Sequence, residues 1–514
     1  MYKKLNTDQR LFGFCLPFGG KLEPQNRWVI MSVQIPWAEI DQKYSCLFTE
    51  EETGSPALPA RVGLGALIIQ GRLGLTDRET VEQIRENPYL QYFLGNTGYR
   101  SEAPFHHTMM VHFRKRFSTV DLAAINGAIV KGALARAAAA DGDGDDAGRP
   151  PAGGGGTPPT NEGKLIIDAT CTPADITYPT DLKLLNEARE KTEAIIDTLH
   201  APYAGREPKP RTYRKKARKA FLCVVMQKKA GPGQIRKAIG KQLGYVKRNL
   251  GAIERMAREG RLPLLSRRLY RLLLVISEVY RQQRQMYASR THRVDDRIVN
   301  LYQPHIRPIV RGKAGSPVEF GAKISVSLVD GFGYVEHLSF DAYNESGDLQ
   351  SQVERYKERY GHYPASVHAD KIYRTRDNRR FCAQWGIRLS GPALGRPVEA
   401  TTDNEDQLKA LKRQQHQDEI DRIAIEGKFG QGKRRFTLAR IMARLADTAT
   451  TVIMVAFIVM NLEKILAGLL LCLFFVWSMA RKAVCNALWA CRRVLSELRR
   501  GPLPAGWGDV CLCR

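Results

Sequence analysis

Two short, largely apolar runs of sequence each lead into an aspartate, and they restrict the folds open to this chain. Residues 165–167 precede Asp168, and residues 365–369 precede Asp370. Runs of this length and composition predict buried strands. In a sheet with helices on its faces, residues at the carboxyl ends of neighbouring strands project into one crevice. We therefore expect Asp168 and Asp370 to meet, although they lie far apart in the sequence.

The order of the predicted elements indicates the fold class. A strand leading to Asp168 is followed by a long, mainly helical insertion at about residues 182–315. Two strands at 322–329 and 334–340 then flank Asp330 and Gly331, which is a hairpin pattern. A helix, the strand before Asp370, a short strand and a charged helix complete the series. This order predicts an α/β fold, a mixed sheet with helices on its faces.

A segment without core-forming residues separates this sheet from the N-terminal part. Residues 139–163 contain acidic residues, paired prolines and a run of glycines, which predicts a flexible linker. We therefore expect a catalytic domain at residues 164–465 and apolar, then basic, C-terminal helices at 466–514. Residues 1–55 are predicted to be rich in loops.

Residues 56–138 predict a small all-α domain. Thr76 and Glu79 have the spacing of a capping box, and a further helix is expected at about 121–137. Three or more short helices with the basic run Arg114, Lys115 and Arg116 are typical of a helix-turn-helix DNA-binding module. A helical dimerisation domain is the alternative.

The charge of the chain points to a polyanionic partner. The formal net charge is +26 and the isoelectric point is near 9.7. Residues 201–310 alone contain 27 Lys and Arg against six Asp and Glu. Binding of these cations to phosphates releases counterions and so favours association. The insertion is therefore predicted to follow the backbone of a nucleic acid, a solvated basic face being the alternative.

Two further features bear on the cellular setting. The ten cysteines form no CxxC pair, and no secretory signal is evident at the start, so a reduced cytoplasmic setting is expected. Residues 465–480 are uncharged and apolar but shorter than the roughly 20 residues that span a bilayer. They predict a buried helix, with a membrane segment as the alternative, and no stable membrane association is expected.

A third acid is predicted from a later, basic stretch. On a helix, Arg422, Glu426 and Lys433 fall within about 40° of one another, so that a carboxylate lies between two cations. Asp418, Glu419 and Asp421 compete for this role. Glycines at 427, 430 and 432 each disfavour a helix by about 1 kcal/mol, so the helix is expected to be irregular or to end here, or to be approached closely by DNA. A surface helix with solvated charges is the alternative.

Three acids of this kind suit phosphoryl transfer by two metal ions. Mg²⁺ prefers hard oxygen ligands and keeps several waters, so a few carboxylates are enough to hold it. Two ions about 3.5–4 Å apart activate the attacking oxygen and stabilise the leaving one. The expected arrangement has Asp168 bridging two ions and Asp370 and Glu426 each binding one.

These motifs together resemble the DDE-type transposases of bacterial insertion sequences. Arg422-x3-Glu426-x6-Lys433 is similar to the end of their signature, although Glu419 replaces the tyrosine usual three residues before the arginine. The residues around Asp168 (167–170) and Asp370 (368–374, including Lys371 and Arg374) are also similar, as is the string 426–435. The resemblance covers roughly residues 55–465, with the three motifs in the family's order.

The resemblance implies a ribonuclease-H-like catalytic fold preceded by a helical domain, with Asp168, Asp370 and Glu426 as catalytic metal ligands. It implies two Mg²⁺ ions, replaceable by Mn²⁺. Terminal inverted repeats and target DNA are the implied substrates, bound by a homo-oligomer on paired ends in the cytoplasm, at the nucleoid. The expected DNA contacts are Arg422, Lys433, Lys371, Arg374, Arg114, Lys115 and Arg116.

Two other functions remain open at this point. A nuclease of the same fold would cut DNA without joining it to a target. A transposase relic or repressor would keep the basic surface and bind DNA without turnover.

Overall fold

The structure is a computed structural model that describes residues 13–16, 19–48, 56–141, 161–313, 316–392, 395 and 404–498. By its internal contacts the chain divides into two compact units, Met1–Asn461 and Leu462–Arg514. The linker predicted at 139–163 lies mostly outside the described residues.

The N-terminal part is mainly helical from Arg27 onward. Its helices are α1 Arg27–Gln34, α2 Trp37–Ser45, α3 Ala60–Leu73, α4 Asp77–Glu86, α5 Pro88–Phe93, α6 Met109–Arg116 and α7 Thr119–Asp141. Thr76 caps α4 by accepting a hydrogen bond from the backbone N–H of Glu79, as predicted. The loop-rich prediction for residues 1–55 was wrong where α1 and α2 form, because Trp28 and Ile40 are buried and anchor them.

A six-stranded mixed sheet forms the centre of the rest of the first unit. Its strands are β1 Lys164–Pro173, β2 Arg307–Lys313, β3 Ser316–Val329, β4 Phe332–Ser339, β5 Ser366–Ala369 and β6 Arg388–Leu389. One edge of β3 pairs with β1. Along its other edge, the first half of β3 pairs with β2 and the second half pairs with β4. β5 and β6 extend the sheet from β1 in parallel. β3 is therefore the strand that runs opposite to its neighbours.

The predicted hairpin is confirmed. β3 and β4 are joined at Asp330 and Gly331, both with positive φ (48° and 76°), as a tight two-residue turn requires. Val329 pairs with Phe332 directly across this turn.

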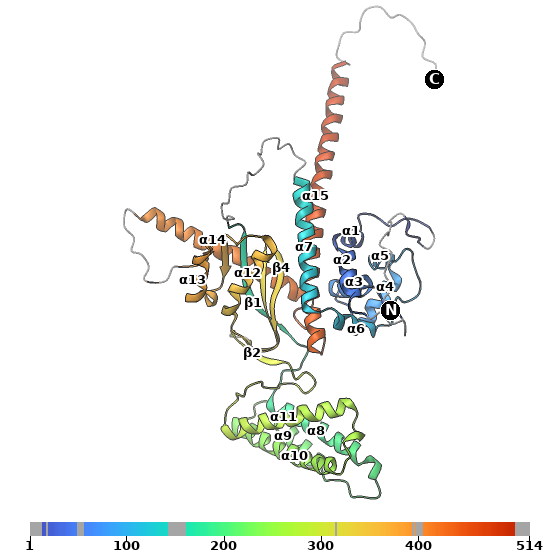
Figure 1. The fold of residues 1–514 in the computed structure, drawn as a ribbon, viewed down its shortest axis with the longest axis vertical. Coiled ribbons are helices and arrows are strands. Elements are labelled where there is room, and N and C mark those ends of the chain that lie inside the picture. Colours follow the sequence, from blue (N-terminus) through green and yellow to red (C-terminus); the bar gives the residue numbers. More distant parts are fainter. Residues whose placement is uncertain are drawn as a thin grey trace, which may run out of the picture. The chain divides into compact units, whose positions relative to one another are not determined.

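Helices cover both faces of the sheet (Figure 1). The amide of Gln352, in α12 Asp348–Tyr360, donates to the Ser325 hydroxyl at 2.7 Å, and Ser325 pairs with Ala169 of β1. The Lys433 ammonium, in α14 Glu405–Arg435, donates to the Thr170 hydroxyl at 3.0 Å. Since neighbouring residues of a strand point to opposite faces, α12 and α14 lie on opposite sides of β1. The shorter elements here are η4 Glu345–Gly347, η5 Lys371–Tyr373 and α13 Arg376–Gln384.

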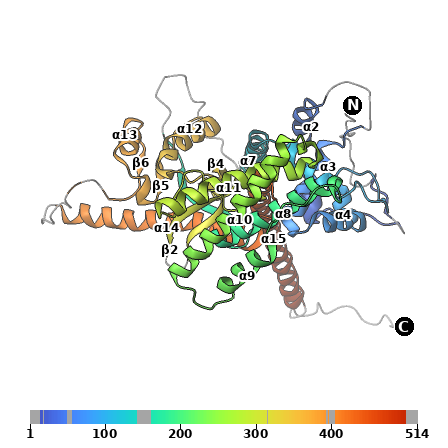
Figure 2. The same cartoon turned by 90° about the horizontal axis from the view of Figure 1, so that it is seen from below.

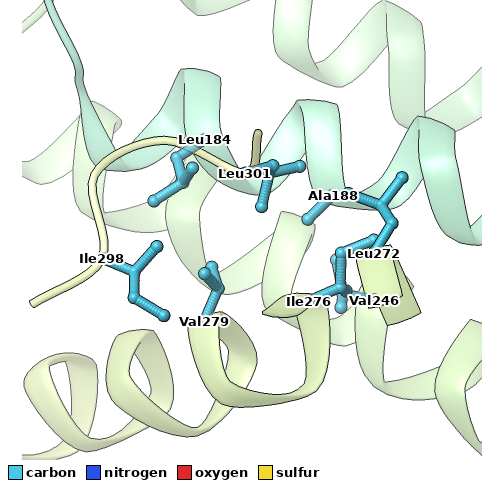
Figure 3. Close-up of a cluster of buried hydrophobic side chains, with 8 residues drawn as sticks. All are labelled: Leu184, Ala188, Val246, Leu272, Ile276, Val279, Ile298 and Leu301. Carbon is cyan, nitrogen blue, oxygen red and sulfur yellow. The ribbon is translucent and has the colours of Figure 1, made fainter. Parts of the chain in front are cut away.

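The insertion between β1 and β2 is helical, as predicted, but its predicted end near residue 315 was wrong because β2 forms at Arg307–Lys313 and pairs with β3. It contains α8 Asp181–His200, η2 Ala201–Tyr203, α9 Arg214–Val225, α10 Pro232–Arg258, η3 Leu262–Leu264 and α11 Arg267–Ser289. α8, α10 and α11 pack side by side around a shared apolar core (Figure 2). Figure 3 shows this core, to which α8 contributes Leu184, α10 Val246 and α11 Ile276.

The last helix is a single element, α15 Ala446–Leu498. Its first turns lie in the first unit, where Ile453 and Phe457 are almost completely buried. In the second unit Ile465 and Leu466 are buried, but Leu469, Leu470 and Leu471 are exposed. The prediction of a buried helix at 465–480 was therefore wrong at these three residues. Side chains 472–480 lie outside the described residues.

Two helices pass a test for membrane spans by length and composition alone. Among the described residues these helices are Thr119–Ala139 and Ala446–Leu471. In the most apolar 18-residue stretch of each helix, 28% and 67%, respectively, is buried. A core helix of a protein without membrane contact passes the same test, and the larger buried share of the second segment is typical of one.

Candidate active site

Asp168 and Asp370 lie side by side on β1 and just beyond β5. The parallel register pairs Ile166 with His368 and Ile167 with Ala369, so the two aspartates occupy the next position. β5 ends at Ala369, and Asp370 caps η5 by accepting from the backbone N–H of Lys371 at 2.7 Å. The sequence prediction that these two carboxylates meet agrees with this register.

Asp168 does not end its strand, however, and that part of the prediction was wrong. β1 continues to Pro173 because its other neighbour, β3, keeps pairing with it as far as Gly321. A Cβ atom at position 321 would collide with the Thr172 carbonyl, so glycine permits this close pairing. Asp168 therefore lies within β1, at the point where the parallel neighbour stops.

Asp168 carries a charge that its surroundings compensate poorly. Its burial raises the pKa of the carboxyl to about 6, against a backbone hydrogen bond from Ala169 that lowers it. The carboxylates of Glu345 and Asp370 raise this pKa further, and Arg422 lowers it. A desolvated carboxylate beside other carboxylates is a place where a bound cation would be stabilised.

Asp168→Asn should raise the free energy of unfolding at neutral and alkaline pH in metal-free buffer. The pKa of the Asp168 carboxyl is about 6 in the folded chain and near 3.8 in the unfolded chain. Ionisation of Asp168 therefore destabilises the fold increasingly as pH rises between these two values. Above pH 6, ionisation of Asp168 lowers the free energy of unfolding by at most about 3 kcal/mol. Denaturant unfolding of the unaltered chain and of Asp168→Asn, at about pH 8 and about pH 4, measures this difference. A variant no more stable than the unaltered chain at the higher pH would contradict this account.

Glu426 lies on α14, which crosses the sheet. The helix runs without a break from Glu405 to Arg435, so the expectation that it is irregular or ends near its glycines was wrong. Gly432 fits because Leu438 and Met460 pack against it, where a Cβ atom would leave too little room. Nothing lies within 4 Å of a Cβ atom at Gly427, so the helix surface beside Glu426 is open.

Arg422 connects the third acid to the second. Its guanidinium lies 3.8 Å from the Asp370 carboxylate and 3.7 Å from that of Glu426, one helical turn further along. Lys433, the third member of the predicted face, reaches Thr170, which lies on the same face of β1 as Asp168. The Arg422, Glu426 and Lys433 face is thus turned toward the two aspartates.

Two of the three competing acids of α14 take part in other interactions, and the third, Glu419, is exposed. Asp418 is buried and accepts two hydrogen bonds from Arg388, at 2.6 and 2.9 Å. Burial alone would raise the pKa of Asp418, but hydrogen bonds from Arg388 and Gln414 outweigh it and leave the pKa lowered. Asp421 pairs with Lys164 at 2.6 Å. These two ion pairs attach α14 to β6 and β1.

A buried polar junction attaches the middle of α14. Lys428, two residues after Glu426, donates to the carbonyl of Gly331 and to the side chain of Asn461. Asn461 also donates to Asn126 of α7 and exchanges hydrogen bonds with the backbone of Gly333. The turn of α14 that bears Glu426 is therefore connected to the β3–β4 hairpin, to α15 and to α7.

The predicted DNA contacts differ in how accessible they are. Lys371 is exposed beside Asp370, and Arg374 is half-buried and donates to the Ala369 carbonyl at 3.3 Å. Lys115 is exposed, and Arg116 is half-buried against Tyr44 and Phe48. Arg114 is buried and pairs with Asp77 and Gln70, so a direct DNA contact by Arg114 was a wrong prediction.

Sequence reasoning missed Glu345 as a neighbour of this site. It lies in η4, is mostly buried and pairs with Lys323 at 2.8 Å. Its charge affects the Asp168 carboxyl more than that of Asp370 does. No motif surrounds Glu345, and only the folded hairpin brings it near β1.

The chemistry of these three carboxylates suits divalent metal ions, but the arrangement of their side chains in this structure suits them less well. Three carboxylates are the hard oxygen donors that Mg²⁺ prefers. Among the described residues, however, no three His, Cys, Asp or Glu side chains are close enough to hold an ion together. The Arg422 guanidinium, between Asp370 and Glu426, is the cation that they contact.

Comparisons with known proteins find transposase domains in two parts of the chain. Residues 367–463, which include Asp370 and Glu426, match the transposase DDE domain family, and residues 17–116 match the transposase domain DUF772. The uncharacterized protein ORF8 in the nfe locus of Rhizobium meliloti is 28% identical over 167 residues, which are 32% of this chain and 71% of that protein. No solved structure matches the chain. Two transposase-domain families thus match separate parts of this chain, and the DDE domain at residues 367–463 implies an enzyme of polynucleotidyl-transferase chemistry.

Proposed function

We propose that this chain is a DDE-type transposase that cuts DNA at the inverted-repeat ends of a mobile element and joins the freed 3′-hydroxyl to target DNA. Asp168, Asp370 and Glu426 are the proposed catalytic residues, with two Mg²⁺ ions, or Mn²⁺ in their place, as the proposed cofactors. The observation that carries this assignment is the adjacency of Asp168 and Asp370 on β1 and β5, with Glu426 linked to Asp370 through Arg422.

A ribonuclease-H-like fold for the catalytic domain belongs to the same proposal. Its support is the strand order β4-β3-β1-β5-β6, in which β3 alone runs opposite to the others, with Asp168 on the central strand and Asp370 directly after its parallel neighbour. We propose the boundaries 56–138, 139–163 and 164–465 for the helical domain, the linker and the catalytic domain, and a tail at 466–514. The transposase-domain match at 17–116 supports adding α1 and α2 to the helical domain.

In the proposed reaction the three carboxylates would hold the metal ions, which supply charge for activating the attacking oxygen and stabilising the leaving oxygen. Arg422, placed between two of the acids, would move toward a phosphate of the DNA when cations take its place. Lys371 and Arg374 would hold that DNA strand beside Asp370, and Lys433 would hold the DNA strand beside Thr170. The open surface at Gly427 would let the sugar–phosphate backbone approach Glu426 closely.

Other parts of the assignment are proposals of the same kind. Lys115 and Arg116 are the basic residues of α6 that we propose for DNA contact. We also propose that the protein acts as a homo-oligomer on paired DNA ends, in the cytoplasm at the nucleoid.

Joined products separate the proposed function from a nuclease. We expect the full chain with Mg²⁺ to nick duplexes that carry the element's ends and to link them covalently to a target plasmid, which gel electrophoresis detects. Nicks without joined products would indicate a nuclease. Binding of the ends without any cleavage would indicate a relic or repressor, and would contradict the proposal.

A further inference from the structure

α10 is the helix of the insertion whose two faces differ most clearly. One face contributes Val246 to the apolar core, beside Leu272 and Ile276 of α11 (Figure 3). Asn249, on the same side, donates to Thr192 of α8 at 3.0 Å. These contacts fix the rotation of α10 about its axis, and with it the residues that face solvent.

The solvent face of α10 is a basic stripe with a regular spacing. At 100° per residue its members fall within an arc of about 100°, and the arc is centred roughly opposite Val246. The stripe consists of Lys237, Lys241, Gly244, Arg248, Gly251, Arg255 and Arg258, and all except Gly251, which is half-buried, are exposed. Five of its seven members are therefore cationic, and the other two have no side chain.

The two glycines leave room along the stripe. Nothing lies within 4 Å of a Cβ atom built at Gly244 or at Gly251. Each glycine weakens the helix by about 1 kcal/mol relative to alanine, and packing does not require either of them. Their position between cations brings bare helix backbone to the surface where a polyanion would lie.

We propose that this stripe of α10 is a binding surface for the phosphate backbone of double-stranded DNA, with Gly244 and Gly251 allowing the backbone to approach the helix closely. The proposal rests on the proposed function, because it assigns part of the substrate DNA to the insertion. It adds a second contact region, separate in sequence from the acids and from the N-terminal helices.

Charge and length both favour a DNA duplex as the occupant. The insertion region 201–310 has 27 basic and six acidic residues, so it attracts polyanions strongly. From Lys237 to Arg258 the stripe is about 31 Å long, close to one turn of B-DNA, about 34 Å. Lysine and arginine on an open backbone suit phosphates rather than base edges, so the contact is expected to be independent of DNA sequence.

Removal of three charges tests the stripe. The variant Lys237→Gln, Lys241→Gln, Arg255→Gln is compared with Arg267→Gln, Arg271→Gln, Arg284→Gln, which removes the same charge from exposed positions of α11. Both carry Asp168→Asn in the full chain, so that binding is measured without cleavage. For the α10 variant we expect the slope of log affinity against log salt to fall by about one for each residue. Its affinity should drop on the order of 100-fold at moderate salt.

The outcomes separate this inference from the proposed function. Equal effects of the two triple variants, or no effect of the α10 variant, would overturn the inference while leaving cleavage by the unaltered chain as evidence for the proposed function. Failure of the unaltered chain to bind any duplex would overturn both. Circular dichroism checks that each variant is folded.

The glycines allow a second test in which stability and binding move in opposite directions. Gly244→Gln with Gly251→Gln should raise the melting temperature, because glutamine favours a helix, but should weaken DNA binding at least tenfold by blocking close approach. Gly127→Gln in α7, whose Cβ position is equally open, is the matched control and should leave binding unchanged. Unchanged binding by the stabilised double variant would overturn the role given to the glycines.

Discussion

Asp168→Asn, Asp370→Asn and Glu426→Gln should each reduce metal-dependent nicking of end-bearing DNA by at least on the order of 10³-fold. Each amide keeps the size of the carboxyl group but removes the negative charge that would hold a divalent cation. The loss should exceed that of a single hydrogen bond, because a bound divalent cation would lose one of its charged ligands, and the nearby Asp418 and Asp421 are already paired with Arg388 and Lys164. Single-turnover nicking of a labelled duplex measures the effect.

Asp421→Asn is the matched control for these substitutions. It removes an equal charge from α14, one residue before Arg422, and affects the pair with Lys164 and the hydrogen bond that Asp421 accepts from Gln417. Its nicking rate should stay within a fewfold of the unaltered chain, since a partly exposed ion pair contributes only about 1 kcal/mol. Nicking retained by all three acid variants would contradict the assignment of the site.

Glu336→Ala should destabilise the catalytic domain by about 3–5 kcal/mol. The Glu336 side chain is 1% exposed, and its carboxylate pairs with Arg355 and Arg359 of α12. It also accepts a hydrogen bond from the Ser327 hydroxyl of β3. The truncation would remove the carboxylate acceptor of two partly exposed arginines and of the buried Ser327 hydroxyl, and Arg355 would keep only the backbone carbonyl of residue 336. The result should be loss of the attachment of α12 to β3 and β4.

Denaturant unfolding followed by circular dichroism measures this change. Glu254→Ala serves as the control, because the pair of Glu254 with Arg258 is 65% and 77% exposed and should contribute less than about 1 kcal/mol. A Glu336→Ala chain as stable as the Glu254→Ala chain would show that the buried cluster contributes little to the fold.

Local sequence patterns predicted the elements whose residues interact mainly with their neighbours in the chain. The Thr76 cap, the turn at Asp330 and Gly331 and the helices of the insertion depend on adjacent residues, and each was found where expected. The adjacency of Asp168 and Asp370 was predictable as well, because β1 and β5 are parallel neighbours, although Asp168 lies within β1 rather than at its end.

The failures share a physical cause, which is contact between distant parts of the chain. β1 extends past Asp168 because β3, well over a hundred residues later, pairs with it. α14 continues through its glycines because Leu438 and Met460 pack on Gly432. Arg114 is buried because Asp77 of α4 neutralises it, although its sequence context is typical of a basic surface. α1 and α2 form around buried aromatic residues that look isolated in the sequence.

Binding of Mn²⁺ should show whether Asp168, Asp370 and Glu426 together form a divalent-metal site. Electron paramagnetic resonance would count the Mn²⁺ ions bound by the full chain in complex with an end duplex, against duplex alone. We predict about two bound ions for the unaltered chain and for Asp421→Asn. Asp168→Asn and Asp370→Asn should lose tight binding. Equal Mn²⁺ binding by all four chains would contradict the assignment of this metal site.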